Sequence, residues 1–180
     1  MANDGGHLLL SNEQKTDLLL QEPAAEKWIR PFMGADEFLY GYRRWCLWLV
    51  SIEPGELRAM TLLKSRVDLV RKHRLESPRE ATRALAASPA LFGEIRQPQG
   101  DYLVIPRVTS EDRAYIPIGY ETSETIASDR VQIVPAATRF QFGILGSRMH
   151  MAWTKTTCCR LESRFNYSNQ IVYNNFPWPG

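Results

Sequence analysis

The chain has 180 residues, which suits one domain, and its hydrophobic fraction of 44% and charged fraction of 23% are typical of a globular protein. No apolar run approaches the ~18 residues of a membrane span, and the opening MANDGGHLLLSNEQK lacks the basic leader and apolar stretch of a signal peptide. The three cysteines are odd in number and form no C-x-x-C motif, which favours a reduced, cytoplasmic protein.

The net charge of +2 is unevenly distributed along the chain. Residues 1–40 carry seven acids against three bases, whereas residues 56–83 carry eight bases against four acids and residues 126–180 carry six bases against two acids. Two basic segments permit a basic face that binds nucleic acid. By itself, such a split is more typical of a solvated surface.

The first third of the sequence predicts helices around one buried strand. The capping box S-x-x-Q at Ser11 begins a first helix, which Pro23 ends. A short helical turn is expected over residues 24–29. The run RRWCLWLV, residues 43–50, predicts a buried strand because it is short and rich in aromatic and aliphatic residues. Glu53-Pro54-Gly55 predicts a turn.

Two helices are predicted in the basic middle segment. The first runs from Glu56 to about Leu75 and has an apolar stripe formed by Leu57, Met60, Leu63, Val67 and Val70. The second is capped by Ser77-Pro78 with Glu80 and runs to about Ala87.

The second half predicts mostly strands. They are expected at DYLVIPRV from Asp101, at residues 115–120, at VQIVP from Val131, at RLESRF from Arg160 and at residues 169–173. One helix is predicted up to about Trp153 from the spacing of Phe142, Leu145, Met149 and Ala152. Helices and strands mix without a βαβ repeat, so we expect a single α+β domain with a mixed, mostly antiparallel sheet and flanking helices.

Motifs of common enzymes are absent from the sequence. There is no Walker loop, G-x-G-x-x-G or G-x-S-x-G, and the three histidines have no zinc-ligand spacing. A lone His150 on a helix is expected to be packed in the core or exposed at the surface, and not to bind a metal. The stretch Asn174-Asn175-Phe176-Pro177 resembles the Asn-Pro-Pro-aromatic loop of amino-methyltransferases, but Asn175 stands where that turn requires proline. We interpret it as a turn followed by an aromatic segment.

The run RLESRFN alternates between two kinds of side chain. Leu161, Ser163 and Phe165 are expected to point one way, and the other face carries Arg160, Glu162, Arg164 and Asn166. Arginine pairs with guanine O6/N7, asparagine with adenine N6/N7, and glutamate accepts from cytosine N4, so this face could contact base edges in a major groove. On the pattern alone, a half-buried strand with a solvated outer face is the favoured interpretation, in which Glu162 and Arg164 simply pair with neighbours across the sheet.

Five blocks of this sequence, in order, resemble one family. DGGHLLLS, IRPFMGADEFLYGYRRWCLWL, DYLVIPRVTSEDRAYIPIGY, FGILGSRMHMAWTKTTCCRL and RLESRFNYSNQIVYNNFPWP are similar to the target recognition domain of MmeI-type (type IIL) restriction–modification proteins and their methyltransferase relatives. The resemblance covers nearly the whole chain. It departs from the family at Cys159, where a glycine often precedes the arginine, which bears on the local strand geometry.

The resemblance implies residues that contact DNA. Base recognition is implied for Glu162 and Arg164 as a pair, for Asn166 with Arg130, and for Asp129 with Arg107. Arg130, Asp129 and Arg107 are assigned by counting along the chain. Phosphate contacts are expected from Arg148, Lys155 and Arg160, and from the basic helix between Arg58 and Arg74.

The resemblance also implies a division of labour within a longer protein. Residues 1–180 would be the DNA recognition domain, with residues 1–10 as a leader from a methyltransferase domain and residues 174–180 as an exit segment. No catalytic residue, metal or cofactor is expected in this segment; the parent would use S-adenosylmethionine on adenine N6, and Mg²⁺ for any DNA cleavage. The expected partners are double-stranded DNA and that methyltransferase domain. The alternatives are a protein-interaction or regulatory domain without a DNA role, or a stand-alone enzyme.

Overall fold

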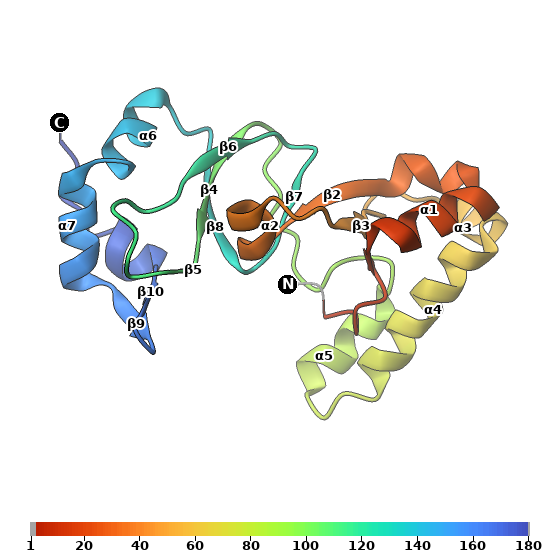
Figure 1. Ribbon diagram of the computed structural model, residues 1–180. Coiled ribbons are helices and arrows are strands. Elements are labelled where there is room, and N and C mark those ends of the chain that lie inside the picture. Colours follow the sequence, from red (N-terminus) through yellow and green to blue (C-terminus); the bar gives the residue numbers. More distant parts are fainter. Residues whose placement is uncertain (1–2, 180) are drawn as a thin grey trace. The chain divides into compact units, whose positions relative to one another are not determined.

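The structure is a computed structural model that describes residues 3–179. Residues 1–2 of the expected leader and residue 180 of the expected exit segment lie outside the described residues. Helices combine with mostly antiparallel strand pairs, so the α+β prediction is confirmed (Figure 1). The chain packs as two compact units, one comprising residues up to Phe32 and Arg43–Arg96, the other Met33–Tyr42 and residues from Gln97 on. No helix within residues 3–179 is long and apolar enough to cross a membrane.

The first unit contains a small sheet and several helices. Its strands are β1 (Leu9–Leu10), β3 (Trp45–Leu47) and β2 (Ile29–Met33), and β3 pairs with both of the others. Its helices are α1 (Asn12–Gln21), η1 (Pro23–Trp28), α3 (Pro54–Ala59), α4 (Thr61–Leu75), α5 (Glu80–Ala84) and η2 (Leu85–Ala87).

Local sequence signals account for most of the first unit. The Ser11 hydroxyl accepts a hydrogen bond from the Gln14 amide, and the Gln14 side chain accepts one from the Ser11 amide, as the capping box predicts. The helix expected from Glu56 to Leu75 is wrong in one respect, because Met60 is extended and divides it into α3 and α4. The turn expected at Glu53–Gly55 is the start of α3, with Pro54 in its first turn.

The second unit has two three-stranded sheets and four helical segments. The first sheet has the order β6 (Gly119–Glu121), β4 (Tyr102–Pro106), β8 (Val131–Pro135), and the second has the order β5 (Val108–Thr109), β10 (Arg164–Asn166), β9 (Cys159–Leu161). The remaining elements are strand β7 (Ile126–Ala127) and the helices α2 (Ala35–Tyr40), α6 (Arg139–Leu145), α7 (Arg148–Thr157) and η3 (Asn169–Tyr173).

Strand β4 lies at the centre of the second unit and is buried on both faces. Leu103 and Ile105 point into one cluster, which includes Leu145 of α6 and Met151 of α7. Tyr102 and Val104 point into another cluster, against which Phe38 of α2 packs. A run of five apolar residues therefore folds as a strand because helices cover it on both sides.

Three predictions for the second unit are wrong. The helix expected up to Trp153 is broken after Leu145, because Ser147 caps a new helix by accepting a hydrogen bond from the His150 amide. The strand expected over residues 169–173 is the π-helical turn η3, begun by Ser168. The strand expected over residues 115–120 begins only at Gly119. Both helical errors arise from serine caps that the apolar pattern does not reveal.

Candidate nucleic-acid interface

The polar run from Arg160 to Asn166 folds as a hairpin, so the prediction of one continuous strand is wrong. Strands β9 and β10 pair with each other, with Leu161 opposite Arg164, and Glu162 and Ser163 form the two-residue turn. Glu162 adopts a positive φ of 57°, a conformation that reverses the chain. A hairpin has the same alternating pattern as a strand, so the alternation alone does not distinguish them.

The hairpin also changes which side chains share a face. In an antiparallel pair, directly opposite residues point to the same side. Arg164 therefore lies beside Leu161, and Asn166 beside Cys159, whereas Arg160 is opposite Phe165 on the other side. The expected polar face of four residues is wrong, because Arg160 does not share a face with Arg164 and Asn166.

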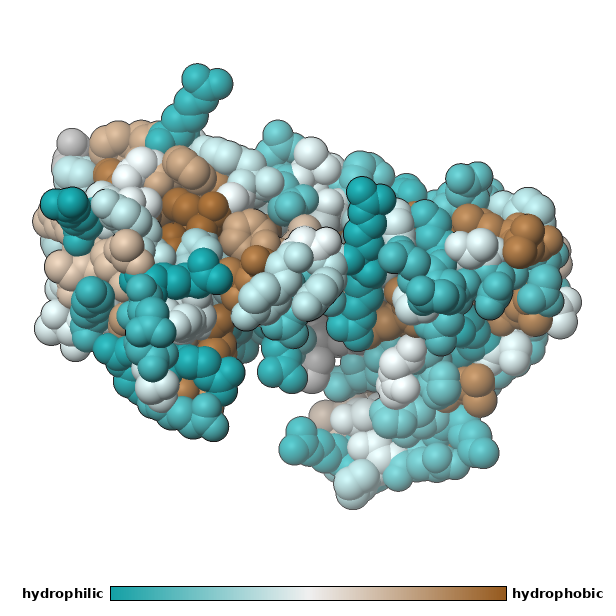
Figure 2. Space-filling model, viewed as in Figure 1, coloured by the Kyte–Doolittle hydropathy of each residue, from teal (hydrophilic) through white to brown (hydrophobic). Residues whose placement is uncertain are grey.

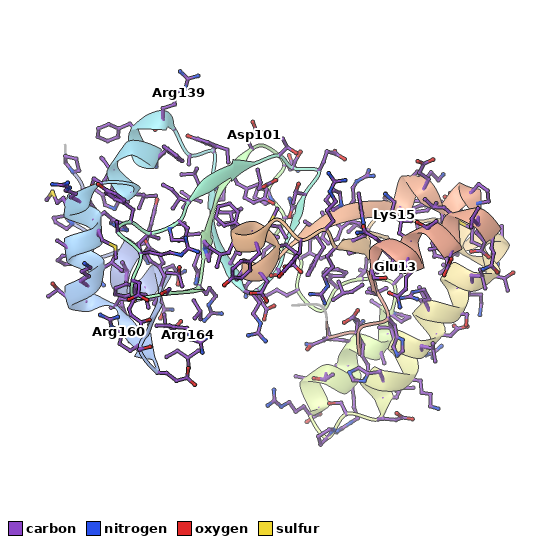
Figure 3. All side chains as sticks on the ribbon, in the orientation of Figure 1. Glu13, Lys15, Asp101, Arg139, Arg160 and Arg164 are labelled. Atoms are coloured by element: carbon purple, nitrogen blue, oxygen red, sulfur yellow. The ribbon has the colours of Figure 1, made fainter. Side chains whose placement is uncertain are left out.

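Charged side chains concentrate at the hairpin turn. A nitrogen of the Arg164 guanidinium lies 2.9 Å from a carboxylate oxygen of Glu162, and the two side chains are 46% and 78% exposed. Arg160 donates to the Ser163 carbonyl at 3.0 Å, and its guanidinium lies 4.0 Å from the centre of the Phe165 ring. Arg160 thus closes the turn and covers the buried Phe165, while the Glu162–Arg164 pair is solvent-exposed (Figure 3).

A second group of charged residues lies where β4 passes into β5 and where β8 begins. The Arg107 amide donates to the Arg130 carbonyl at 3.0 Å, and the Arg107 guanidinium donates to the Asp129 carbonyl at 3.2 Å. These bonds extend the β4–β8 pairing, in which Pro106 is opposite Val131. Sheet register therefore brings Arg107 next to Asp129 and Arg130, which lie more than twenty positions later in the sequence.

The two groups are joined through β10. Asn166 pairs with Val108 of β5, and the Tyr167 amide donates to the Arg107 carbonyl at 2.6 Å. Asn166 therefore lies opposite Val108, the residue that follows Arg107 in the chain. The six residues expected to contact bases therefore lie on neighbouring segments that backbone hydrogen bonds join. These segments are the start of β8, the residues around Arg107, and the hairpin of β9 and β10.

Glu111 is a member of this region for which the sequence offered no signal. Strand β5 ends at Thr109, which pairs with Phe165 of β10, and Glu111 lies in the turn that follows β5. A hydrogen bond with the Ser163 side chain lowers the pKa of Glu111, and the charges of Arg160 and Arg164 lower it further. Glu111 lies in the irregular loop TSEDR, residues 109–113, where no periodic pattern of side chains indicates that it is near the hairpin.

The three residues expected to contact phosphates are exposed. Arg148 and Lys155 lie on helix α7, and Arg160 lies on strand β9. Arg148 begins α7, and Lys155 lies seven residues later, two turns along the same helix face. The Arg148 guanidinium lies 3.5 Å from the Tyr115 hydroxyl. Figure 2 shows a hydrophilic surface at the lower left of the view, over the hairpin of β9 and β10.

The basic helix of the first unit is not uniformly available to phosphates, which corrects the expectation for two of its arginines. Arg74 is only 1% exposed, and its guanidinium donates to carbonyls of Asn3, Leu85, Ser88 and Leu91. Arg66 donates to the carbonyls of His7 and Leu9, each at 2.8 Å. Both arginines donate to backbone carbonyls of their own unit. The expectation that their guanidinium groups face solvent and bind phosphates is therefore wrong.

His150 is buried next to Tyr167, the residue that follows strand β10. It is fully buried, its Nε2 lies 3.0 Å from the Tyr167 hydroxyl, and its ring meets Phe176 edge-on with centroids 4.8 Å apart. Burial lowers the pKa of His150 to about 4, so the ring is neutral at pH 7. Within residues 3–179, no three His, Cys, Asp or Glu side chains come together as a metal site.

Comparisons with known proteins agree on one family. The chain matches the family described as "MmeI, target recognition domain" over residues 1–180. It is 35% identical over 179 residues to DNA methyltransferase A of Bacillus subtilis (strain 168), covering 99% of this chain and 20% of that protein.

A solved structure is similar over the same length. It is that of the Type IIL restriction-modification enzyme MmeI in complex with DNA, with 42% sequence identity and a TM-score of 0.96, covering 99% of this chain and 24% of that chain. This chain thus spans about a fifth to a quarter of the relatives it matches.

Proposed function

The chain belongs to the MmeI target recognition domain family, and we propose that it recognises a specific base sequence in double-stranded DNA. The hairpin of β9 and β10 would enter the major groove, where each base pair presents a distinct pattern of donors and acceptors. Glu162, Arg164 and Asn166 would contact base edges from the hairpin. Arg107, Asp129 and Arg130 would contact neighbouring base pairs.

The observation that carries this proposal is the backbone connection between the two charged groups. Arg107 bonds to Arg130 on one side and to Tyr167 on the other, so strand pairing ties both groups to a single support. A rigid support matters because base readout depends on donors and acceptors held at fixed spacing. The similarity to MmeI in complex with DNA supports the same conclusion.

Affinity would come from contacts that do not depend on sequence. Arg148, Lys155 and Arg160 are exposed and would neutralise phosphates, which fixes the position of the protein on the duplex. The Arg160 guanidinium would do so while it still covers Phe165, because it has donors beyond the one used for Ser163.

We further propose a role within a longer protein. The parent would transfer a methyl group from S-adenosylmethionine to adenine N6, and this domain would hold the duplex so that the correct adenine is flipped out. The segment itself would carry neither cofactor nor catalytic group, and any nuclease domain of the parent would need Mg²⁺. Residues 1–10 would lead from the methyltransferase domain, and residues 174–180 would leave the recognition domain. The cytoplasm would be its location.

Selection from a random pool of duplexes tests the proposal. The chain is incubated with the pool at low salt, and bound DNA is recovered and sequenced. Enrichment of one asymmetric motif is the expected result. No retention of DNA at any salt concentration would contradict the proposal and favour a protein-interaction domain. Pure chain that transfers labelled methyl groups to DNA would contradict the assignment of catalysis to another domain.

A further inference from the structure

Gln132 on strand β8 is a polar residue in a row of buried apolar side chains. In the antiparallel pairing of β4 with β8, Gln132 lies opposite Ile105, and Val134 lies opposite Leu103. Opposite residues point to the same side of a sheet, as do residues two apart on one strand. Leu103, Ile105 and Val134 are buried in one apolar cluster. An apolar residue would complete this row, so packing does not explain a glutamine at position 132.

The carboxamide of Gln132 is not used within the fold. The residue is half-buried, yet its side chain makes no hydrogen bond with another residue of the described range 3–179. Polar groups in such positions normally have a partner in the protein, in water or in a ligand. The side chain of Gln141, by contrast, accepts a hydrogen bond from the Thr138 amide and caps α6. Gln132 therefore offers an acceptor and two donors to a molecule outside the chain.

A cavity of about 340 Å³ lies next to Gln132, and residues of β8 and η3 and Tyr167 line it as well. This cavity borders two segments that carry proposed base contacts. Arg130 lies two residues before Gln132, and Asn166 directly precedes Tyr167. A group that enters the cavity from this side can therefore reach the Gln132 carboxamide.

We propose that Gln132 is a further specificity-determining residue and that it recognises an adenine of the bound duplex. The proposal rests on the proposed function, because it adds a contact to the same DNA interface. A glutamine side chain forms two hydrogen bonds with one adenine, since its NH₂ group donates to N7 and its carbonyl accepts from the N6 amino group. In the major groove this combination of acceptor and donor distinguishes adenine from the other bases.

The first test is selection from the random duplex pool with the wild-type chain and two variants of this residue. Gln132→Leu has no polar group and matches the apolar row. We expect it to relax the preference for adenine at one position by roughly tenfold. Gln132→Glu keeps the shape but offers only acceptors, so the preference at that position should move to cytosine, whose N4 amino group donates.

Gln170→Leu is the matched control for the selection. Gln170 is an exposed glutamine of η3 and does not line the cavity. This variant should keep the wild-type motif. An unchanged motif in Q132L, a relaxed position that is not adenine, or equal relaxation in Q170L would overturn the proposal.

Urea denaturation distinguishes recognition from a structural role. Leucine at position 132 would pack beside Ile105 and Val134 and would leave no protein group unpaired. We therefore expect the urea midpoint of Q132L to equal or exceed that of the wild-type chain. A lower midpoint would show that the carboxamide stabilises the fold, and it would overturn the proposal.

A modified duplex tests the contact directly. The adenine whose preference Q132L relaxes is replaced by 7-deazaadenine, which lacks the N7 acceptor but still pairs with thymine. Binding of the wild-type chain should weaken severalfold, whereas binding of Q132L should be the same for both duplexes. Equal losses in the two proteins would overturn the proposal, because the N7 contact would then belong to another residue.

The outcomes for this proposal and for the proposed function can be told apart. If the wild-type chain enriches no motif, the proposed function fails and the role of Gln132 fails with it. If the wild-type chain enriches a motif that Q132L keeps, the proposed function stands and the role of Gln132 does not.

Discussion

Glu162 occupies a left-handed backbone conformation, with φ at 57°, and from there its carboxylate binds the Arg164 guanidinium at 2.9 Å. This conformation favours glycine, so a side chain is kept at a position where the backbone would be more stable without one. Strained residues of this kind are often found at functional sites. The ion pair is solvent-exposed and contributes little stability, so folding alone does not explain its presence.

Exchange of the pair should change one base of the selected motif. In Glu162→Lys combined with Arg164→Asp, donors and acceptors trade places at the turn while the net charge is kept. We expect selection from random duplexes to show a new preference at one position and the old preference elsewhere, because the side chains of the other proposed base contacts are unchanged. A motif identical to that of the wild type would count against the role of this pair.

Glycine at position 162 should separate stability from recognition. Glu162→Gly removes the backbone strain and is expected to raise the free energy of unfolding by about 1 kcal/mol, measured by urea denaturation. The same variant should lose preference at one base position in the selection. Ser163→Gly, at the neighbouring turn position without a positive φ, is the control and should not stabilise the chain. A less stable E162G chain would contradict the strain argument.

Substitution of the exposed bases should weaken binding to all duplexes alike. Arg148→Gln and Lys155→Gln each remove one expected phosphate contact, so the slope of log affinity against log salt should fall by about 1 per residue. Binding to selected and random duplexes should drop by the same factor. Arg139→Gln is the control, because Arg139 lies at the start of α6, away from the hairpin arginines (Figure 3). A change of the selected motif in R148Q or K155Q would mean that these residues contact bases.

Arg74 should matter for folding. In Arg74→Met the buried guanidinium is lost and the carbonyls of Leu85, Ser88 and Leu91 lose their shared donor, which should lower the free energy of unfolding by roughly 3 kcal/mol. Arg71→Met, at an exposed position of the same helix, should change it by less than about 0.5 kcal/mol. Chemical denaturation of both variants measures the difference. Equal effects would show that the buried network contributes no stability.

His150 should make the stability of the chain fall in mild acid. Its pKa is about 4 in the folded protein and 6.5 is its ordinary value, so the unfolded chain takes up the proton first. The contribution is fully present above about pH 6.5 and is lost as the pH falls toward 4. Between pH 7 and pH 5 the expected loss is roughly 2 kcal/mol. His150→Gln, which retains a polar group near Tyr167, should show a flatter pH dependence over this range; identical curves would contradict the argument.

Short-range signals in the sequence predicted part of the fold correctly. The capping box at Ser11 marks the start of α1, and the apolar runs at Tyr102 and Val131 mark β4 and β8, because capping and burial of a strand depend on neighbouring residues. Interruptions were missed where one residue decides the outcome, as at Met60 between α3 and α4 and at Ser147 before α7. The hairpin turn at Glu162 was missed because glutamate is not a turn residue by preference.

By itself, the sequence determined the α+β class, most helices and buried strands, and through its resemblance the family and the chemical types of the residues proposed to contact DNA. Only the tertiary structure decided which of these residues meet. It brought Arg107 to Arg130, and it turned Arg74 inward as a structural residue. The physical reason is that strand register and the burial of a charge depend on segments far apart in the chain, whose pairing leaves no periodic pattern in either segment.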